Sequence, residues 1–503
     1  MKRLFFLLSL TGAVALSACE KDLDQLPISS GSVPEFYKTP ADFDQAMTSV
    51  YSQLRGFPDR EVFLSEVRSD NIYAVSVVGG RDWDPINNFS PLLTINPIVA
   101  DAWASDFSTI YRVNTLLDQL AANGAVAGAL RPRYEAEAKF IRAFMYFDLV
   151  RKFGKVPVID HALLPRDVAQ IPRADVTKVY DLIISDLQAA IAALPVSYTG
   201  TNVGRVTAGA AKGILALVYL TRSGPTYGIN GPGLDSKEYD KASALLDDLI
   251  AARGTARYAT QATYAGIFAP TAENNSEVIF DIQYLANGSV GGSFQNIVVP
   301  DGYYTQLGLP FSAGSVEIKP TSNDLANTSY SLTDLRRAFN IQFGFVIPNF
   351  TDTRPFFKKY VNVAARGVNR NDWGLNYIVL RYSDVLLMKA ECLVRGVGGS
   401  SADALLLVNP IRLRAGVPAL TSLDLPGLME ERRREFAGEN LRWNDLVRSG
   451  LALTVMNTWA QKEDLAPPFN KITRPITANL LLYPVPQVEL SSVPGLYDQN
   501  PGY

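Results

Sequence analysis

Apolar side chains recur at steps of three and four residues along most of the chain, which is the spacing of one face of an α-helix. In the first such stretch, which begins near Ala41, this face contains Phe43, Met47, Val50, Tyr51 and Leu54. The same spacing predicts helices over residues 100–121, 134–153, 176–194, 204–222, 236–252, 385–394 and 402–415. The hydrophobic pattern therefore predicts a mainly α-helical fold.

Two pairs of these predicted helices have the features of a helical repeat. In the first pair, the small residues Ala208, Ala211, Gly213 and Ala216 would let the following helix approach closely. This arrangement is similar to the stacked helix pairs of tetratricopeptide arrays. Residues 385–394 and 402–415 form a second such pair, in which we expect Pro410 to kink or interrupt the second helix.

Two long segments, residues 68–97 and 257–379, lack the helical spacing. The first contains Gly79-Gly80 and three prolines, and the second combines glycine-rich turns with short β-like runs such as residues 277–282. Long irregular segments inside a compact body are uncommon unless they bind a ligand or are disordered. Because their aromatic content argues against disorder, we expect these segments to carry ligand-facing loops.

The N-terminus has the pattern of a bacterial lipoprotein signal. Lys2 and Arg3 precede an apolar run that is too short to span a bilayer and that ends in Leu16-Ser17-Ala18-Cys19. We expect residues 1–18 to be a cleaved signal peptide and Cys19 to be acylated. Residues 19–40 would then form a lipidated tether that holds a folded body at a membrane.

The composition is that of a folded globular protein, with 47% hydrophobic and 19% charged residues in a chain of 503. The formal net charge is −3, and no long basic run indicates a nucleic-acid partner. With Cys19 acylated, Cys392 would be the one remaining thiol, so the mature chain cannot form an internal disulfide. We expect Cys392 to be a small buried side chain.

The irregular segments contain residues suited to binding sugars. A sugar presents both C–H faces and hydroxyl groups, so a capture site needs flat aromatic rings with amide or carboxylate groups beside them. Trp83 lies in the polar loop Arg81-Asp82-Trp83-Asp84-Pro85, where no helical spacing assigns it to the core. The candidate ligand-binding residues are Trp83, Asn87, Asn88, Tyr303, Tyr304 and Trp373.

Other conspicuous residues have structural interpretations. The charges of residues 431–435, with Arg442, Asp445 and Arg448, are at helical spacing and predict ion pairs within and between helices. Trp103 and Trp443 lie in helical patterns and are predicted to be in the core. We expect residues 228–233 to form a turn and His161, the one histidine, to lie at the surface or to form a hydrogen bond.

Seven groups of residues carry a resemblance to a known family, in that family's order. They are Cys19 with Leu23-Asp24 and Pro27; residues 137–150 with Phe153-Gly154 and Val156-Pro157; Gly204-Arg205-Val206-Thr207 before Ala211-Lys212-Gly213; residues 274–280; residues 380–388; residues 431–435 with 442–448; and residues 482–486 with the closing Asn500-Pro501-Gly502-Tyr503. In these residues the chain resembles the SusD/RagB-type outer-membrane lipoproteins of the Bacteroidetes lineage.

The resemblance implies a mostly helical platform of tetratricopeptide-like pairs with a less regular, ligand-binding part. It also implies a location at the outer membrane, facing the cell exterior. There the protein would act as a lid over a SusC-like TonB-dependent β-barrel transporter. It would capture oligosaccharides, or peptides in some members, and deliver them to that partner.

The chain departs from the family pattern at two places. Gly438 and Asn440 stand where a bulky apolar residue and a glycine are expected, and Asn409-Pro410 interrupts the usual helix. We expect these departures to alter the local packing of helices rather than function.

The expected organisation is one SusD-like body over residues 41–503. Its helical parts are predicted at about 41–256 and 380–450, and its irregular parts at about 68–97, 257–379 and 451–503. We expect no catalytic residue, metal or cofactor, although the sequence leaves open whether a calcium ion supports a loop.

Two other functions stay open from the residues alone. A lipid-anchored glycoside hydrolase needs only two carboxyl groups beside the scissile bond, although no zinc motif, nucleophile elbow or second histidine is present. A helical-repeat protein scaffold would instead use its helices for docking, so that loop tryptophans would be unimportant for binding.

Overall fold

The computed structural model describes residues 36–74, 80–252, 258–288, 290–311, 319–463 and 475–503. The predicted signal peptide, Cys19 and most of the tether 19–40 lie outside these residues. Within the described ranges, no helix has both the length and the apolar character needed to cross a membrane.

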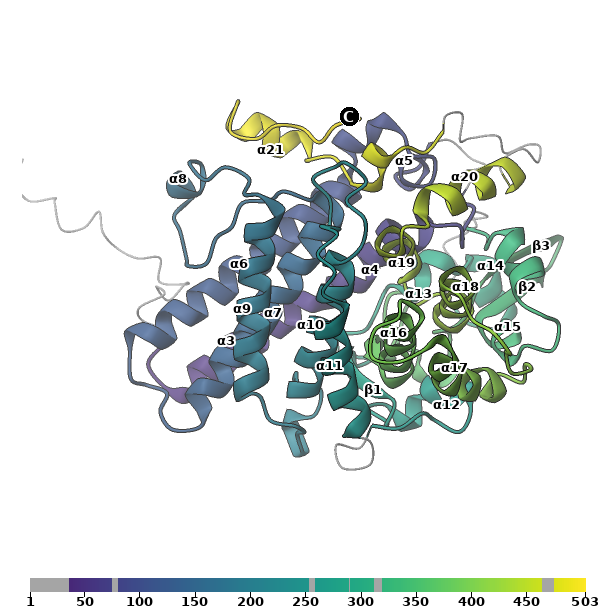
Figure 1. Ribbon diagram of the computed structural model, residues 1–503, viewed down its shortest axis with the longest axis horizontal. Helices are drawn as coiled ribbons and strands as arrows, with labels where there is room; N and C mark the ends of the chain where they lie inside the picture. The colour runs from purple at the N-terminus through teal and green to yellow at the C-terminus, as the bar shows by residue number, and fades with distance from the viewer. Residues whose placement is uncertain (1–35, 75–79, 253–257, 289, 312–318, 464–474) are drawn as a thin grey trace, which may run out of the picture.

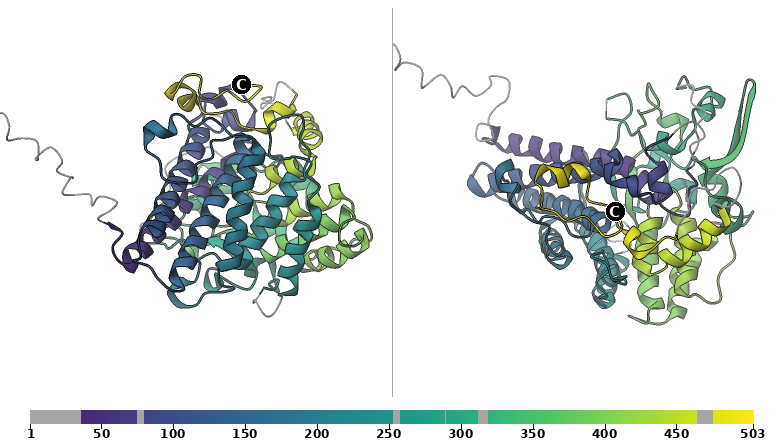
Figure 2. Two further views of the ribbon diagram at one scale, coloured as in Figure 1. Left: turned by 60° about the vertical axis from the view of Figure 1, so that its left-hand side comes forward. Right: turned by 90° about the horizontal axis from the view of Figure 1, so that it is seen from above.

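The described chain is mostly helical, as the hydrophobic pattern predicts, and Figure 1 shows its longer helices. They are α3 (Pro40–Gln53), α6 (Pro97–Ala122), α7 (Leu130–Phe153), α9 (Val176–Ala193), α10 (Ala208–Arg222), α11 (Tyr239–Ala251), α16 (Tyr382–Val394), α17 (Ser401–Arg414), α18 (Leu425–Phe436), α19 (Arg442–Ser449) and α20 (Ala452–Glu463). Figure 2 shows α6, α7, α9, α10 and α11 as a row of neighbouring helices. This row contains the helix pair predicted from the small residues of α10.

Helix α7 is covered on several sides, as its all-round apolar sequence predicts. It packs between α6 and α9, and its ring of Phe140 also meets Phe280 of the central strand edge-on at 5.2 Å. A helix that is apolar all round must be buried in this way. The aromatic side chains of α7 therefore join the helical row to the rest of the body.

Helix α17 runs through Pro410 without a break, so the prediction that Pro410 interrupts it is wrong. A proline removes one backbone donor, which leaves the carbonyl four residues earlier without its partner. That carbonyl belongs to Leu406, whose side chain is 73% exposed, so water can reach this turn. Buried Val408 and Ile411 on the other face hold the helix against its neighbours.

The less regular part consists of short elements. The short helices are α4 (Phe57–Glu61), α5 (Asp84–Asn87), α8 (Pro165–Val168), α12 (Tyr264–Ile267), α13 (Gln295–Val298), α14 (Asp301–Gln306), α15 (Leu335–Asn340) and α21 (Gln487–Ser492). The single-turn helices are η1 (Leu54–Gly56), η2 (Val62–Val67), η3 (Pro91–Ile95), η4 (Gly200–Asn202), η5 (Pro270–Ala272), η6 (Asp324–Ser329), η7 (Val363–Ala365) and η8 (Ala478–Leu481). Two antiparallel strand pairs complete this part: β1 (Val278–Ile282) with β4 (Tyr377–Arg381), and β2 (Ile341–Ile347) with β3 (Phe350–Phe357).

Three expectations about local structure are settled by these elements. Strand β1 confirms the β-like run predicted at residues 277–282. Tyr303 and Tyr304, predicted in a β-like stretch, lie instead in helix α14. Residues 451–503, predicted to be irregular, contain helices α20 and α21. Helices this short depend on tertiary packing rather than on local propensity, which explains why the sequence pattern missed them.

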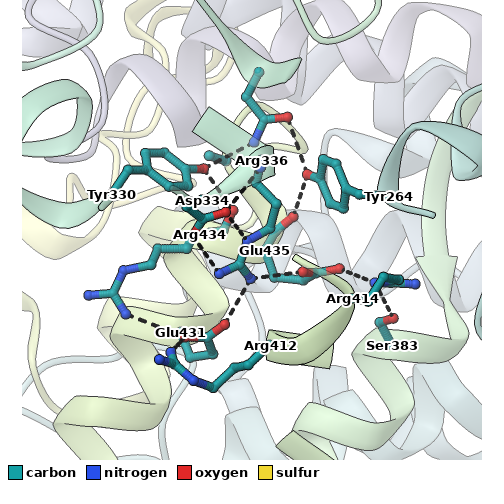
Figure 3. Close-up of polar contacts among 12 residues, drawn as sticks. Tyr264, Tyr330, Asp334, Arg336, Ser383, Arg412, Arg414, Glu431, Arg434 and Glu435 are labelled. Carbon is teal, nitrogen blue, oxygen red and sulfur yellow. Dashed lines mark hydrogen bonds and ion pairs between the residues drawn. The ribbon is translucent and has the colours of Figure 1, made fainter. Parts of the chain in front are cut away.

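Helix α18 carries a buried network of ion pairs (Figure 3). Glu431 and Glu435 both accept hydrogen bonds from Arg336 of α15, at 2.8 and 2.9 Å, and all three side chains have no exposed surface. Arg414 of α17 also pairs with Glu435, at 2.6 Å. The charges of residues 431–435 are therefore structural ion pairs, as predicted.

A second buried arginine joins α18 to the central strands. Arg381 of β4 pairs with Glu277 beside β1 at 3.0 Å, with Glu435 of α18 at 2.8 Å and with Glu439 at 2.9 Å. Burial of these charged side chains costs desolvation free energy, which their ion pairs and hydrogen bonds offset. Loss of one partner would leave a buried charge uncompensated. This requirement fixes the helix, the strands and the following turn relative to one another.

Gly438 and Asn440 lie in the turn between α18 and α19. Both have left-handed backbone conformations, with φ of 78° and 63°, which glycine and asparagine tolerate better than other residues. The amide of Gly438 donates to Glu66, and the side chain of Asn440 donates to Tyr377. The departures from the family pattern thus form a turn with its own partners.

We predict that Asp70→Asn lowers the free energy of unfolding at pH 7 by about 3–5 kcal/mol, because it breaks a buried ion pair. Asp70 is bound at 2.8 Å through both oxygens by Arg442. Burial opposes ionisation of Asp70, but Arg433 and Arg442 outweigh it and lower the pKa of the carboxyl to about 2.

The Asp70 contribution is therefore present above about pH 4 and is lost as the pH falls towards 2. Urea denaturation at several pH values checks this, with Asp181→Asn on the exposed face of α9 as the matched control. Equal stability of the Asp70→Asn and Asp181→Asn chains would contradict the prediction.

Candidate functional site

The predicted loop tryptophan Trp83 lines a cavity of about 280 Å³. The cavity lies where the start of α5 meets α13 and α14, in the right-hand half of Figure 1. Its lining residues are Arg81, Trp83, Asn296, Ile297, Val298, Val299, Pro300, Asp301, Lys319 and Arg370. We refer to it below as the Trp83 cavity.

Backbone pairing brings the distant segments of the Trp83 cavity together. The amide of Tyr73 donates to the carbonyl of Pro320 at 2.9 Å, which joins the residues after η2 to the neighbour of Lys319. Gly292 and Trp373 exchange two backbone hydrogen bonds, of 2.7 and 3.1 Å. This second pairing holds the loop with Arg370 against the segment that leads into α13.

The ring of Trp83 is half-buried and has cationic neighbours. Phe63 stacks beside it with ring centroids 6.4 Å apart and planes within 11°. The ammonium of Lys319 lies 3.8 Å from the centroid of Trp83, and the guanidinium of Arg81 lies 5.9 Å from it. These are favourable cation–π contacts, which hold both cations beside the indole ring at the cavity wall.

Two polar atoms of the cavity wall lack hydrogen-bond partners among the described residues. They are the indole nitrogen of Trp83, which is a donor, and the side-chain oxygen of Asn296, which is an acceptor. Buried polar atoms without partners are uncommon because each costs about 1–3 kcal/mol. Both atoms are shielded from solvent, so they belong to the packed side of the wall rather than to the surface that a ligand would contact.

The charged side chains of the Trp83 cavity are held in defined positions. Lys319 donates to the carbonyl of Ile297 at 2.7 Å. Arg370 pairs with Asp301 at 2.7 Å, and the side chain of Arg370 is 31% exposed while that of Asp301 is 3% exposed. The buried carboxylate of Asp301 thus fixes the position of Arg370, whose side chain lines the cavity.

Trp373 does not face solvent, which corrects the expectation that its ring is a platform for a ligand. The residue has no exposed surface and packs against Tyr304 and Phe311, with ring centroids 5.8 and 6.0 Å away. Its indole N–H donates to the carbonyl of Arg370 at 2.9 Å. Trp373 therefore supports the loop that presents Arg370.

The other predicted residues also lie mostly beneath the surface. Tyr303 and Tyr304 are 8% and 0% exposed in the same aromatic cluster, and Asn87 is 2% exposed. The amide of Asn87 donates to two backbone carbonyls, so it fixes the loop after Trp83 rather than facing a ligand. Asn88 is half-buried but does not line the cavity. A ligand contact by Trp83 stays a prediction.

Sequence reasoning selected Trp83 but not the other polar residues that line the same cavity, Asn296, Lys319 and Arg370. Arg370 lies three residues before Trp373, and Asp301 two before Tyr303. The prediction relied on aromatic residues. Trp373, Tyr303 and Tyr304 pack inwards, because a large apolar side chain gains most from burial. The nearby polar residues are the ones that reach the cavity.

A larger cavity of about 500 Å³ lies elsewhere, between the end of α3, the loop around η4 and β1. Its wall includes Tyr51 and Arg205, but both have partners in the protein: the hydroxyl of Tyr51 accepts from Val206, and Arg205 pairs with Glu137 and Asp44. No tryptophan lines it. The Trp83 cavity is therefore the better candidate for stacking on a sugar.

The predictions for the two helical tryptophans, the free cysteine and the histidine agree with the structure. Trp103 and Trp443 are buried, and Cys392 is a buried free thiol whose pKa is raised to about 12 by burial. His161 is exposed and lies 2.7 Å from Asp160. Within the described part of the chain, no cluster of three or more potential metal ligands occurs.

Comparison with known proteins identifies the family. One family model, described as the SusD family, matches residues 345–503, and a second, described as "Starch-binding associating with outer membrane", matches residues 24–220. The chain belongs to the SusD/RagB family. A SusD-like protein of Formosa agariphila is 26% identical over 97% of each chain.

Solved structures agree with this family. A laminarin-binding SusD-like protein has 27% identity and a TM-score of 0.75, covering 93% of this chain and 100% of its own. Surface glycan-binding protein A from Bacteroides thetaiotaomicron, in complex with laminarihexaose, is 22% identical with a TM-score of 0.75, covering 92% of this chain and 99% of its own, and supports the fold. Both of these structural relatives are described as glycan-binding proteins.

We predict that Trp373→Ala lowers the free energy of unfolding by about 3–5 kcal/mol, because it leaves a cavity in a packed aromatic cluster. Trp83→Ala is expected to cost less than about 2 kcal/mol, because its ring is half-buried at the surface. Chemical denaturation of both variants measures the difference. A Trp373→Ala chain as stable as the Trp83→Ala chain would contradict the assignment of Trp373 to the core.

Proposed function

We propose that this protein captures oligosaccharides at the Trp83 cavity and delivers them, as a lid, to a SusC-like TonB-dependent β-barrel transporter. The observation that carries the proposal is the cavity itself: an indole ring and polar side chains line one hollow on a SusD-type fold. Membership of the SusD/RagB family supports the same role.

The chemistry of the Trp83 cavity suits a saccharide. Its volume of about 280 Å³ is that of a small ligand pocket and is large enough for a sugar ring. The indole can stack on C–H groups, while Asn296 and the cations provide hydrogen bonds to hydroxyl oxygens.

The proposal places the protein on the outer membrane, facing the cell exterior, through a lipid anchor at Cys19. The description of the matched family model as associating with the outer membrane supports this location. A folded body on an acylated tether stays near the transporter while its loops meet the ligand. The row of helices offers a surface for the transporter, and the cavity lies among the loops.

Hydrolysis of the ligand is not favoured by the Trp83 cavity. A glycoside hydrolase uses two carboxyl groups on either side of the scissile bond. Of the described residues that line the cavity, only Asp301 has a carboxyl group, and Arg370 neutralises it. The bound saccharide should therefore be released unchanged.

We predict that Trp83→Ala weakens oligosaccharide binding at least about tenfold while the protein stays folded, because stacking on the ring is lost. Isothermal titration of the purified protein with laminarihexaose and with acidic oligosaccharides checks this. The matched control is Thr48→Trp, which fills the larger cavity beside α3. Binding that survives Trp83→Ala but is lost in Thr48→Trp would place the site in the larger cavity instead.

We predict that Cys19→Ala abolishes acylation and moves the protein out of the membrane fraction. Labelling of cells with a radioactive fatty acid, followed by fractionation, measures both effects. Cys392→Ala is the control, because this buried thiol should not be acylated. Retention of label in the Cys19→Ala chain would overturn the anchor.

A further inference from the structure

We propose that a second pocket, between α6 and the C-terminal helix α21, binds small quaternary ammonium compounds. The pocket has a volume of about 190 Å³ and shares no lining residue with the Trp83 cavity. Figure 1 shows α8 and α21, which both border it, near the upper end of the helical row. We refer to it below as the Glu489 pocket. This inference goes beyond the proposed capture of saccharides and does not depend on it.

Aromatic rings form much of the wall of the Glu489 pocket. Trp103, Phe107 and Tyr111 follow one another at four-residue steps on α6, so they share one face of that helix. Tyr497 joins them from the C-terminal segment. The ring centroid of Trp103 lies 5.1 Å from that of Phe107, with planes 46° apart, and 6.1 Å from that of Tyr497, with planes 55° apart. Rings with different tilts present their surfaces in different directions, which is the arrangement of an aromatic cage.

A single carboxylate, that of Glu489 on α21, lies among the described residues that line this pocket. Glu489 is half-buried, and burial raises the pKa of its carboxyl, while a hydrogen bond from Trp103 opposes this shift. Neither influence is a positive charge, and the described lining contains no lysine or arginine. Because a carboxylate can accept about four hydrogen bonds, the bond from Trp103 leaves Glu489 able to bind a cation.

The neighbouring charged groups do not cancel the charge of Glu489. His161 also lines the pocket, but its Nδ1 lies 2.7 Å from a carboxylate oxygen of Asp160, which balances any positive charge on the ring. Arg173 lies near Tyr497 without lining the pocket, and its guanidinium donates to three backbone carbonyls. The pocket therefore combines aromatic rings with one negative charge.

Hydrogen bonds fix the segments that form the wall. Asn114 of α6 donates to the carbonyls of Ile159 and His161, at 2.9 and 3.2 Å, which holds the segment after α7 against α6. Asn500 donates to two backbone carbonyls, at 2.9 and 2.7 Å, and so ties the segment that follows Tyr497 to the body. The Glu489 pocket is therefore formed before a ligand binds, which lowers the entropic cost of binding.

These features match a weakly hydrated organic cation better than other classes of ligand. A neutral ligand that covered Glu489 would leave a desolvated charge uncompensated. A primary ammonium has three donors and is strongly hydrated, so it needs more acceptors than one carboxylate supplies. A quaternary ammonium has no N–H group, and aromatic faces within about 6 Å stabilise its charge.

The test compares ligands that differ in charge but not in shape. The probes are choline and 3,3-dimethyl-1-butanol, a neutral alcohol in which carbon replaces the quaternary nitrogen. Titration calorimetry with the full chain should show that choline binds at least about tenfold more tightly than the alcohol. Ethanolamine should also bind more weakly than choline, because its primary ammonium is harder to desolvate. If the alcohol or ethanolamine binds as tightly as choline, the assignment to quaternary ammonium compounds is wrong.

Two variants place the cation in this pocket. Glu489→Gln keeps the size of the side chain and should lower the affinity for choline about tenfold while leaving that for the alcohol unchanged. Tyr111→Leu removes a ring that is 52% exposed and should weaken choline binding about two- to fivefold. Asp181→Asn, on the exposed face of α9, removes a carboxylate outside the pocket and should change neither affinity. A variant that merely disturbed the fold would weaken both ligands equally.

The outcomes distinguish this inference from the proposed function. Choline binding that falls in Glu489→Gln, with oligosaccharide binding unchanged, supports a separate site for the cation. If choline does not bind, or if its affinity is unchanged in both Glu489→Gln and Tyr111→Leu, the inference is wrong but saccharide capture stands. Choline binding that is lost in Trp83→Ala and kept in Glu489→Gln would also overturn it, because the cation would then occupy the Trp83 cavity.

Discussion

The buried ion pairs of helix α18 are the constraint on which the rest of the structure depends. Its charged residues 431–435 contact segments that are far apart in the chain: α15 through Arg336, α17 through Arg414 and the central strands through Arg381. Arg433 also reaches Asp70 near the N-terminal helices. Because removal of one partner leaves a buried charge uncompensated, these segments must assemble together. This set joins α18 to α15, to α17, to the central strands and to Asp70.

The candidate site uses that fixed frame through a layer of buried aromatic residues. This layer consists of Trp373, Tyr304 and Phe311, whose rings pack against one another. The indole N–H of Trp373 donates a hydrogen bond to the backbone carbonyl of Arg370. Above this layer, Trp83 and the cations face the cavity. The site therefore has a rigid apolar support and a polar, partly exposed wall, which is the usual division of labour in a binding site.

The separation of support and wall explains how one fold can bind different saccharides. The helical row and the ion pairs set where the loops lie, whereas the side chains at the cavity wall set what they contact. In this chain those side chains are an indole ring and three cations. A structural relative of similar fold is described as binding laminarin, so fold likeness alone does not fix the ligand.

The sequence by itself determined the helices and the family. The three- and four-residue spacing located α6, α7, α9, α10, α11 and α16 closely, because a long amphipathic pattern fixes which face is buried. It also identified the ion pairs of residues 431–435 and the loop of Trp83. These features depend on local spacing, which a sequence records directly.

Tertiary structure decided which side chains of the loops point outwards. Trp83 and Trp373 both have polar neighbours in the sequence. Trp83 nevertheless lines a cavity, whereas Trp373 is buried. Lys319 meets Trp83 only because residues 72–73 pair with residues 320–321. Contacts between residues more than two hundred positions apart leave no periodic signal, so only the assembled fold could bring these charges to one ring.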